Sequence, residues 1–413
     1  MKTAYTDLRT KRKGYLGQTN KPGVLLVVII GAGLLVRLAF SMILPDPNFL
    51  PRVQHETDVV EYFAIAQNLL AGQGFSLDGE IPTAFRPPVY PLLIALCHVN
   101  PYGVVFLHLV GFVFSSWLLW RIAVRVLHNK YRAIVVVGCY AIYVEFVAYD
   151  MLFITENVFM MGFLGSIEGL FILRKTPYKV FLMITTAGCA ALTALTRPIG
   201  LYLFPLLFVL LGFSRIEGFH WQRLAFMLFI FFLVLSPWFL RNYYHFQQVV
   251  FVTNGGSNLY FGNLRDGTKG WPSQSDDFRP AGNEVQKDRI YIAEAIHLIK
   301  NTWKTVPLLW FRKLLRLWFN LGYGHDYRWS YQGMFVTLSR FLLFSFFSAT
   351  IFWWKSLDPL FLVLLLFLMI FFTGLHVVIY ASPRFFIPVL PFMIIAILSG
   401  GIPSRFRVSQ HYA

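Results

Sequence analysis

Long apolar runs recur along the whole chain, which leaves few folds open to it. A helix that crosses a bilayer needs about 20 mainly apolar residues. Ten stretches reach or approach that length, at residues 24–44, 102–126, 132–150, 156–173, 179–195, 198–213, 222–242, 333–354, 359–380 and 384–400. The sequence therefore predicts an all-α polytopic membrane protein with about ten transmembrane helices.

The composition favours the same class of protein. Hydrophobic residues make up 57% of the 413 residues and charged residues 14%, whereas soluble domains are about 25% charged. The formal net charge of +16 raises the question of nucleic-acid binding, but that function needs a basic face on a soluble module. The basic residues instead lie between the apolar runs, so we expect no nucleic-acid partner.

The connections between the runs alternate in the sign of their charge. Basic residues concentrate before residue 24 and at 121–132, 174–179, 215–223, 355 and 405–407, and acidic residues, Asp150 among them, fill the alternate connections. Basic connections face the cytoplasm, which predicts cytoplasmic termini and a site on the outer face of a plasma membrane, most simply a bacterial one. We expect a basic N-terminus (1–23), one transmembrane domain (24–400) with outward loops at 45–101 and 243–332, and a cytoplasmic tail (401–413).

The first outward loop combines an acidic start, a short amphipathic helix and an Arg-Pro-Pro segment. In TDVVEYFAIAQNLL, at 57–70, the apolar residues share one face, which favours a helix lying on the membrane surface. Asp58 stands at its start, where a carboxylate can accept the proton of an attacking hydroxyl. Its alternative role is that of a helix-capping acid. Glu56 lies nearby and could equally be solvated.

A second candidate acid, Glu156, stands at the outer end of the run at 156–173. Ionisable groups at membrane depth tend to be functional, although the helix dipole also explains an acid in a first turn.

Arginines also stand at the outer ends of helices: Arg86, Arg197, Arg241 and Arg384. A guanidinium binds phosphate with paired donors, so two that converge would form a lipid-phosphate clamp. The alternative is snorkelling to the membrane interface. Arg86 and Arg197 each precede a proline and Arg384 follows one, which indicates a fixed backbone, and we favour function for Arg86 and Arg384.

The second outward loop contains segments of different character. VTNGGSNLYFGN, at 252–263, has the Gly and Asn content of turns. NEVQKDRIYIAEAIHLIKN, at 283–301, has helical apolar spacing, and PLLWFRKLLRLWFN, at 307–320, is basic and amphipathic, as surface helices are.

No HExxH, P-loop, GxSxG or cysteine cluster occurs in the chain. Cys97, Cys139 and Cys189 stand in apolar runs, where we expect them to fill the core. Within the spans, His376 is expected to be a core histidine and Arg37 to snorkel or pair. We expect no resident cofactor; the question of a divalent metal stays open.

Several short pieces follow one another in an informative order. They are Asp58 with Tyr62 four residues later, IAQNLLAGQGFS, TAFRPPVYPLLIAL, ITENVF, ALTRPIGLYLFP, PWFLRNYYHFQQVVFVTNGGSNLYFGN and YASPRFFIPVLPF. From Val24 to Gly400 this pattern resembles the polyprenyl-phosphate-sugar-dependent glycosyltransferases of the GT-C superfamily, near bacterial protein-mannosyltransferase-like and aminoarabinose-transferase-like proteins.

The resemblance implies a catalytic aspartate in the first outward loop, acting as base in an inverting transfer, and Asp58 stands there. Val59 follows it where many relatives carry a glutamate, so no role is assigned to an adjacent acid. The residues expected to bind substrate are Tyr62, Arg86, Glu156, Arg197, Asn254, Asn258, Tyr260 and Arg384.

The predicted function is an inverting hexosyl or pentosyl transfer from a polyprenyl-phosphate donor to an acceptor hydroxyl of a glycan, lipid or protein. The expected partners are the donor, the acceptor and membrane lipids. Two alternatives stay open: a lipid-linked-sugar flippase or other transporter, and a non-catalytic membrane assembly subunit. Transporters usually show repeats and broken helices at mid-membrane, whereas this chain concentrates its acids and Arg-Pro turns at one face.

Overall fold

The computed structural model describes residues 21–43, 57–176, 179–213, 221–264, 278, 280–321 and 331–400. Across these residues the regular structure is helical, apart from one isolated bridge between Ser76 and Pro82. The prediction of an all-α protein is therefore confirmed. The N-terminus as far as Asn20, Glu56 and the tail at 401–413 lie outside the described residues.

The helices follow the apolar runs and the amphipathic segments of the loops. In the first part of the chain they are α2 (Lys21–Ile43), α4 (Thr57–Leu70), α5 (Val89–Leu96), α6 (Pro101–Leu127), α7 (Lys130–Ile142), α8 (Val144–Met151), α9 (Glu156–Lys175), α10 (Val180–Ala194), α11 (Gly200–Phe213) and α12 (Trp221–Phe246). The later ones, with η for a 3-10 helix, are α13 (Gly255–Asn263), α14 (Glu284–Asn301), α15 (Val306–Phe319), α16 (Tyr331–Ser348), η2 (Ala349–Ser356), α17 (Pro359–Val378), η3 (Pro383–Val389) and α18 (Leu390–Leu398).

Six helices of the described chain are long and apolar enough to cross a membrane. They are Lys21–Met42, Pro101–Leu127, Glu156–Lys175, Trp221–Phe246, Met334–Lys355 and Pro359–Val378. A seventh span would consist of α7 and α8, which are bent by 56° relative to each other because Tyr143 between them has an extended backbone, with φ −64° and ψ 122°. The apolar helices α10 and α11 are shorter, so the number ten stays a prediction.

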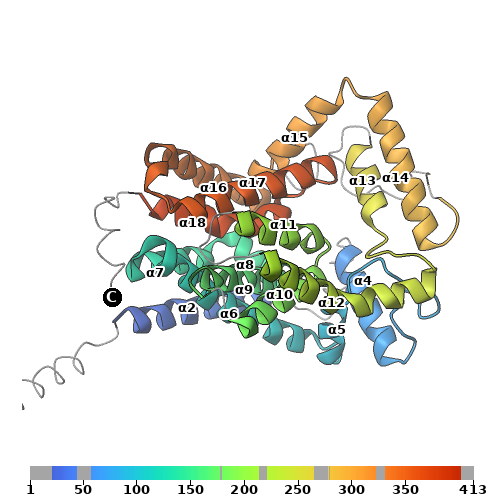
Figure 1. Cartoon of the computed structure of the whole chain (residues 1–413), viewed down its shortest axis with the longest axis horizontal. Helices are drawn as coiled ribbons and strands as arrows, with labels where there is room; N and C mark the ends of the chain where they lie inside the picture. Colours follow the sequence, from blue (N-terminus) through green and yellow to red (C-terminus); the bar gives the residue numbers. More distant parts are fainter. Residues whose placement is uncertain are drawn as a thin grey trace, which may run out of the picture.

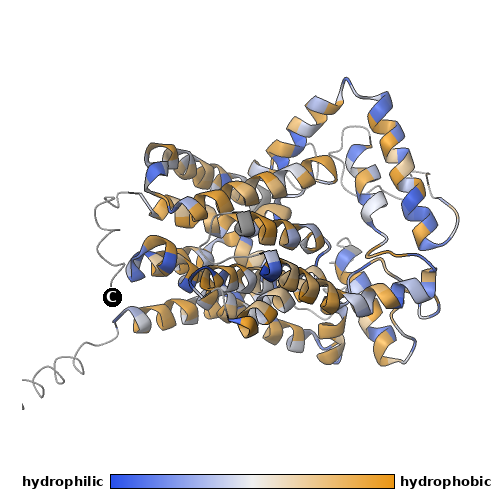
Figure 2. Cartoon of the chain, viewed as in Figure 1, coloured by the Kyte–Doolittle hydropathy of each residue, from blue (hydrophilic) through white to orange (hydrophobic). Residues whose placement is uncertain are grey.

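The apolar helices lie side by side in a bundle, α13 and α14 lie beyond one end of it, and α15 packs beside α17 and leads away from the bundle to α14 (Figure 1). Hydrophobic residues dominate the bundle, and hydrophilic ones are frequent on α13 and α14 (Figure 2). At the opposite end, Arg132 in the first turn of α7 donates to the carbonyl oxygens of Leu398 and Gly400, both at 3.1 Å. We call this the basic end and the end near α4 and α13 the site end.

Helices α9 and α10 approach each other closely through small residues. Gly162 and Gly169 of α9 face Thr193 and Thr186 of α10, and a Cβ at either glycine would overlap the threonine Oγ1. Small residues allow close backbone approach where lipid removes the hydrophobic driving force between helices. This contact places the start of α9, at Glu156, beside the segment that follows α10.

A buried ion pair joins α2 to α8 inside the bundle. Arg37 donates to Asp150 Oδ2 at 2.7 and 2.9 Å and to the carbonyl oxygen of Ala141 at 2.9 Å. Because the last carbonyls of a helix lack helical partners, Arg37 compensates for the break after α7. Arg37 therefore pairs rather than snorkels, and Asp150 is buried rather than exposed in a connection.

We predict that Asp150→Asn destabilises the protein, because it leaves the Arg37 guanidinium buried without its counter-ion. Removal of one partner of a buried pair lowers the free energy of unfolding by about 3–5 kcal/mol. Denaturant unfolding of the purified protein in detergent measures this loss. The double variant Arg37→Met with Asp150→Leu should regain part of it, and a single variant as stable as the native protein contradicts the prediction.

Candidate functional site

Asp58 lies between two arginines at the site end of the bundle. Its Oδ1 accepts from Arg86 Nη2 and its Oδ2 from Arg384 Nη2, each at 2.6 Å. The three side chains are 14–19% exposed. The structure thus brings together one residue from α4, one from the loop before α5 and one from η3, as the clamp hypothesis required.

Glu61 extends this cluster by one turn of α4. Its Oε2 accepts from Arg86 Nε at 2.5 Å. Residues three apart share one side of a helix, so the pair Asp58 and Glu61 forms an acidic edge that faces Arg86. Glu61 was not among the residues predicted for the site; its spacing of three residues from Asp58 is the signal in the sequence that could have identified it.

The apolar face of α4 packs on protein, which corrects the expectation that this face lies on the membrane surface. Val59, Tyr62 and Phe63 are buried in a hydrophobic cluster with residues of α5, α6 and α9. Tyr62 meets Tyr90 edge to face, with ring centroids 5.0 Å apart. The periodicity identified the helix but not its neighbour, because an apolar face suits a protein core as well as a lipid surface.

Glu156 and Arg197 form the second half of the cluster. Glu156 Oε1 lies 2.9 Å from Arg197 Nη1 and 3.9 Å from Arg384 Nε. Arg384 therefore lies between Asp58 and Glu156, and the two halves of the cluster are continuous through it.

Aromatic rings cover the faces of these guanidinium groups. The ring centroid of Phe385 lies 5.1 Å from the Arg384 guanidinium and 5.4 Å from that of Arg197, and His376 stacks on Phe385 at 4.4 Å. Arginine stacks well on aromatic faces, which leaves the N–H groups at its edge for oxyanions. Phe385, which we did not single out from the sequence, thus helps to orient both arginines.

Backbone contacts hold the segments that carry the arginines. Val89 N–H, just after the Arg86-Pro87-Pro88 segment, donates to the Leu195 carbonyl at 3.1 Å. Arg340, which is buried and paired with Glu145, donates to the Pro383 carbonyl at 2.9 Å. The segments that carry Arg86 and Arg384 are therefore each held by a hydrogen bond from or to a distant part of the chain.

Helix α14 is attached to the segment before Arg86 through Glu284, at its start. Its carboxylate accepts from Thr83 Oγ1, and at 2.9 Å from both Ala84 N–H and Thr253 Oγ1. Arg241 supports the same segment, because it donates to the Thr83 carbonyl at 2.6 Å. Arg241 therefore positions backbone rather than joining the clamp.

The residues predicted from the glycine-rich segment lie on or next to α13. Asn254 is buried at its start, and the Asn258 N–H donates to the Asn254 carbonyl at 3.2 Å. Tyr260 packs against Phe261 and Tyr291 in the contact between α13 and α14. Their expected contact with substrate stays a prediction.

The arginines determine the protonation state of Asp58. Burial raises the pKa of Asp58, but the positive charges and hydrogen bonds of Arg384 and Arg86 outweigh burial and hold that pKa well below its ordinary value. For Glu61, burial outweighs the attraction of Arg86 and the pKa is raised. Asp58 is therefore ionised at neutral pH, with each of its oxygens bound to an arginine.

The arginines of the cluster carry the donor groups that the binding of an oxyanion requires. Arg86, Arg197 and Arg384 are each paired with a carboxylate, and guanidinium groups bind phosphate through the same paired donors. An incoming phosphate can therefore replace Asp58 as the ligand of Arg86 and Arg384. Within the described ranges, no group of three or more His, Cys, Asp or Glu residues is placed to hold a metal ion.

Comparison of the chain with protein-family models, with curated proteins and with solved structures found no match in any of the three.

We predict that Asp58→Asn lowers the unfolding temperature by an amount that depends on pH. A carboxyl whose folded pKa lies below its ordinary value of 3.8 stabilises the folded state above that value, and the contribution disappears as the pH falls through the folded pKa. The temperature gap between native protein and variant should be constant from about pH 7 to 5 and narrow below about pH 4.

Differential scanning fluorimetry in detergent measures this gap. Glu80→Gln removes an exposed acid from the same loop and is the matched control, with no gap expected. A gap that already narrows between about pH 7 and 5 would show that Asp58 titrates above its ordinary range.

Proposed function

We propose that the protein transfers a sugar from a polyprenyl-phosphate donor to an acceptor hydroxyl, with inversion, at the outer face of a bacterial plasma membrane. The convergence of Asp58, Arg86 and Arg384 at one end of an apolar bundle carries the proposal. The ordered pieces that resemble GT-C glycosyltransferases support it, and so does the alternation of charge, which predicts that the site end faces outward.

Donor binding would activate Asp58. The donor phosphate takes the place of the Asp58 carboxylate on Arg86 and Arg384, which removes the hydrogen bonds that depress the Asp58 pKa. The phosphate charge then lies close to the released carboxylate, and a nearby like charge raises a pKa. The base therefore becomes stronger in the complex in which it is needed.

The proposed transfer step uses these groups as base and as phosphate ligands. The acceptor oxygen bonds to the anomeric carbon while the bond from that carbon to the phosphate oxygen breaks, and the electron pair leaves with the phosphate. The acceptor proton passes to Asp58. Arg86 and Arg384 stabilise the charge that develops on the departing phosphate, and Glu156 positions Arg197 and Arg384.

The bent pair of α7 and α8 favours a second function, that of a lipid-linked-sugar flippase, because broken helices occur at transporter sites. Arg37 and Asp150 at this bend satisfy each other, however, and Asn157 also donates to Asp150 at 2.9 Å. The bend is therefore stabilised internally, and transferase activity is the better-supported function.

We predict that Asp58→Asn lowers the rate of sugar transfer by about a hundredfold or more, because a positioned base is lost. The assay follows release of polyprenyl phosphate from a polyprenyl-phosphate hexose by protein in nanodiscs, with membrane extract as the source of acceptor. Glu80→Gln is the control and should keep native activity. Native release by Asp58→Asn refutes the assignment, and donor movement across vesicles without release indicates the flippase.

We predict that Arg384→Gln weakens donor binding by about 10- to 100-fold, because a charged hydrogen bond contributes about 1.5–3 kcal/mol. Titration with the same donor in nanodiscs gives the Kd. Arg289→Gln, which removes an exposed arginine from α14, is the matched control. An unchanged Kd in Arg384→Gln contradicts the clamp.

A further inference from the structure

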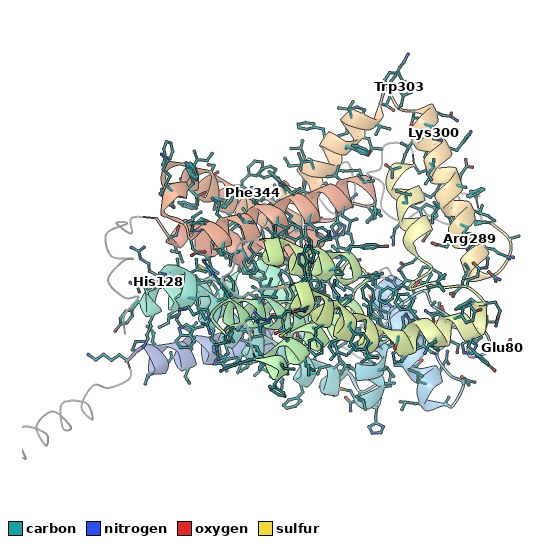
Figure 3. All side chains as sticks on the ribbon, in the orientation of Figure 1. Glu80, His128, Arg289, Lys300, Trp303 and Phe344 are labelled. Atoms are coloured by element: carbon teal, nitrogen blue, oxygen red, sulfur yellow. The ribbon has the colours of Figure 1, made fainter. Side chains whose placement is uncertain are left out.

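The turn between α14 and α15, together with the first half of α15, exposes large apolar side chains. Trp303, Leu308 and Phe311 are 66%, 53% and 55% exposed. Figure 3 shows Trp303 and Lys300 at the tip of this hairpin, which extends sideways from the site end of the bundle in Figure 1. Large apolar side chains that are exposed together in this way mark a surface for contact with another protein or a membrane.

The charge of the same segment has one sign. Residues 295–321 contain Lys300, Lys304, Arg312, Lys313 and Arg316 but no aspartate or glutamate. Lys300 and Lys304 are exposed, and the Lys304 ammonium lies 5.9 Å from the ring centroid of Trp303. Basic residues beside exposed tryptophan, phenylalanine and leucine are typical of helices that lie on anionic lipid.

Two contacts fix the level of α15 relative to the apolar bundle. Trp318 Nε1 donates to Thr373 Oγ1 of α17 at 2.9 Å, and the buried Lys313 Nζ donates to the carbonyls of Val378 and Ile379, at 3.1 and 3.2 Å. From one contact to the other, the residue number falls by five in α15, from 318 to 313, and rises by five in α17, from 373 to 378. The two helices therefore run antiparallel here. Burial lowers the pKa of Lys313 to about 7.

The helix rise then places the exposed side chains. At about 1.5 Å per residue, Phe311 lies at most about 3 Å and Leu308 about 7.5 Å beyond the level of Lys313, where α17 ends. The headgroup layer on each side of a bilayer is about 5–8 Å thick. With α17 as a membrane span that ends at the edge of the hydrocarbon layer, both side chains lie at the depth of the lipid headgroups, a layer in which tryptophan is also enriched.

We infer that the α14–α15 turn and the exposed face of α15 dock on the bilayer surface and bind anionic lipid headgroups. The apolar side chains enter the boundary between headgroups and acyl chains, and Lys300 and Lys304 bind lipid phosphates. This surface is separate from the Asp58 cluster, and the inference holds whether or not the protein transfers sugars.

Spin labels on the full chain in nanodiscs test the docking. In a background with the three cysteines replaced by alanine, labels are placed at Trp303→Cys and Phe311→Cys. Glu80→Cys in an exposed loop gives the aqueous reference, and Ile370→Cys, 72% exposed on α17, gives the lipid reference. We expect oxygen to reach the labels at 303 and 311 better than a water-soluble nickel complex does, as at 370 and unlike at 80.

The lipid charge is tested with nanodiscs of phosphatidylcholine alone or with one third phosphatidylglycerol. We expect the anionic lipid to lower nickel accessibility at 303 at least twofold, and Lys300→Gln with Lys304→Gln to abolish that change. Labels at 303 and 311 that match the label at 80 overturn the docking. Immersion that is independent of phosphatidylglycerol overturns the anionic-lipid assignment, and dipolar broadening between two copies overturns lipid in favour of self-association.

Discussion

The pairing of the Asp58 carboxylate with two arginines is the interaction on which the site depends. A carboxylate or a guanidinium enclosed at the end of an apolar bundle is strongly destabilising unless it is paired, and here Asp58 pairs at once with Arg86 and Arg384. Arg384 lies 326 residues beyond Asp58, so this contact joins the beginning of the chain to its end. The same contact holds the pKa of Asp58 below its ordinary value and so lowers its basicity.

The short helix α8 connects this cluster to the rest of the bundle. Its eight residues include two buried carboxylates, Glu145 paired with Arg340 of α16 and Asp150 paired with Arg37 of α2. Arg340 in turn donates to the carbonyl of Pro383, next to Arg384. The bend before α8 allows both carboxylates to reach arginines on separate helices. Because Arg340 binds both Glu145 and the Pro383 carbonyl, this pairing also holds the backbone next to Arg384.

Helix α14 links the exposed turn before α15 to the segment that precedes Arg86. Helix α14 starts at Glu284, which is bonded to Thr83 and Ala84 just before Arg86, and it ends at the turn that exposes Trp303. A single helix of 18 residues thus separates the surface at which lipid would bind from the loop that carries the clamp. Lys313 holds the other arm of this hairpin to the end of α17.

The sequence by itself determined the helical class, with apolar runs long enough to cross a membrane, and singled out Asp58, Arg86 and Arg384 as candidate residues. Run length and the presence of charged residues at the ends of the runs are local properties of the chain. Only the tertiary structure decided the partners: that α4 packs on protein, that Glu61, Phe385, Arg340 and Glu145 support the clamp, and that Asp150 is buried. From the sequence, a single charged side chain in a helix is equally compatible with a helix cap, a snorkelling group or one partner of an ion pair. The distinction depends on which distant helix packs against it, and periodicity carries no information about that neighbour.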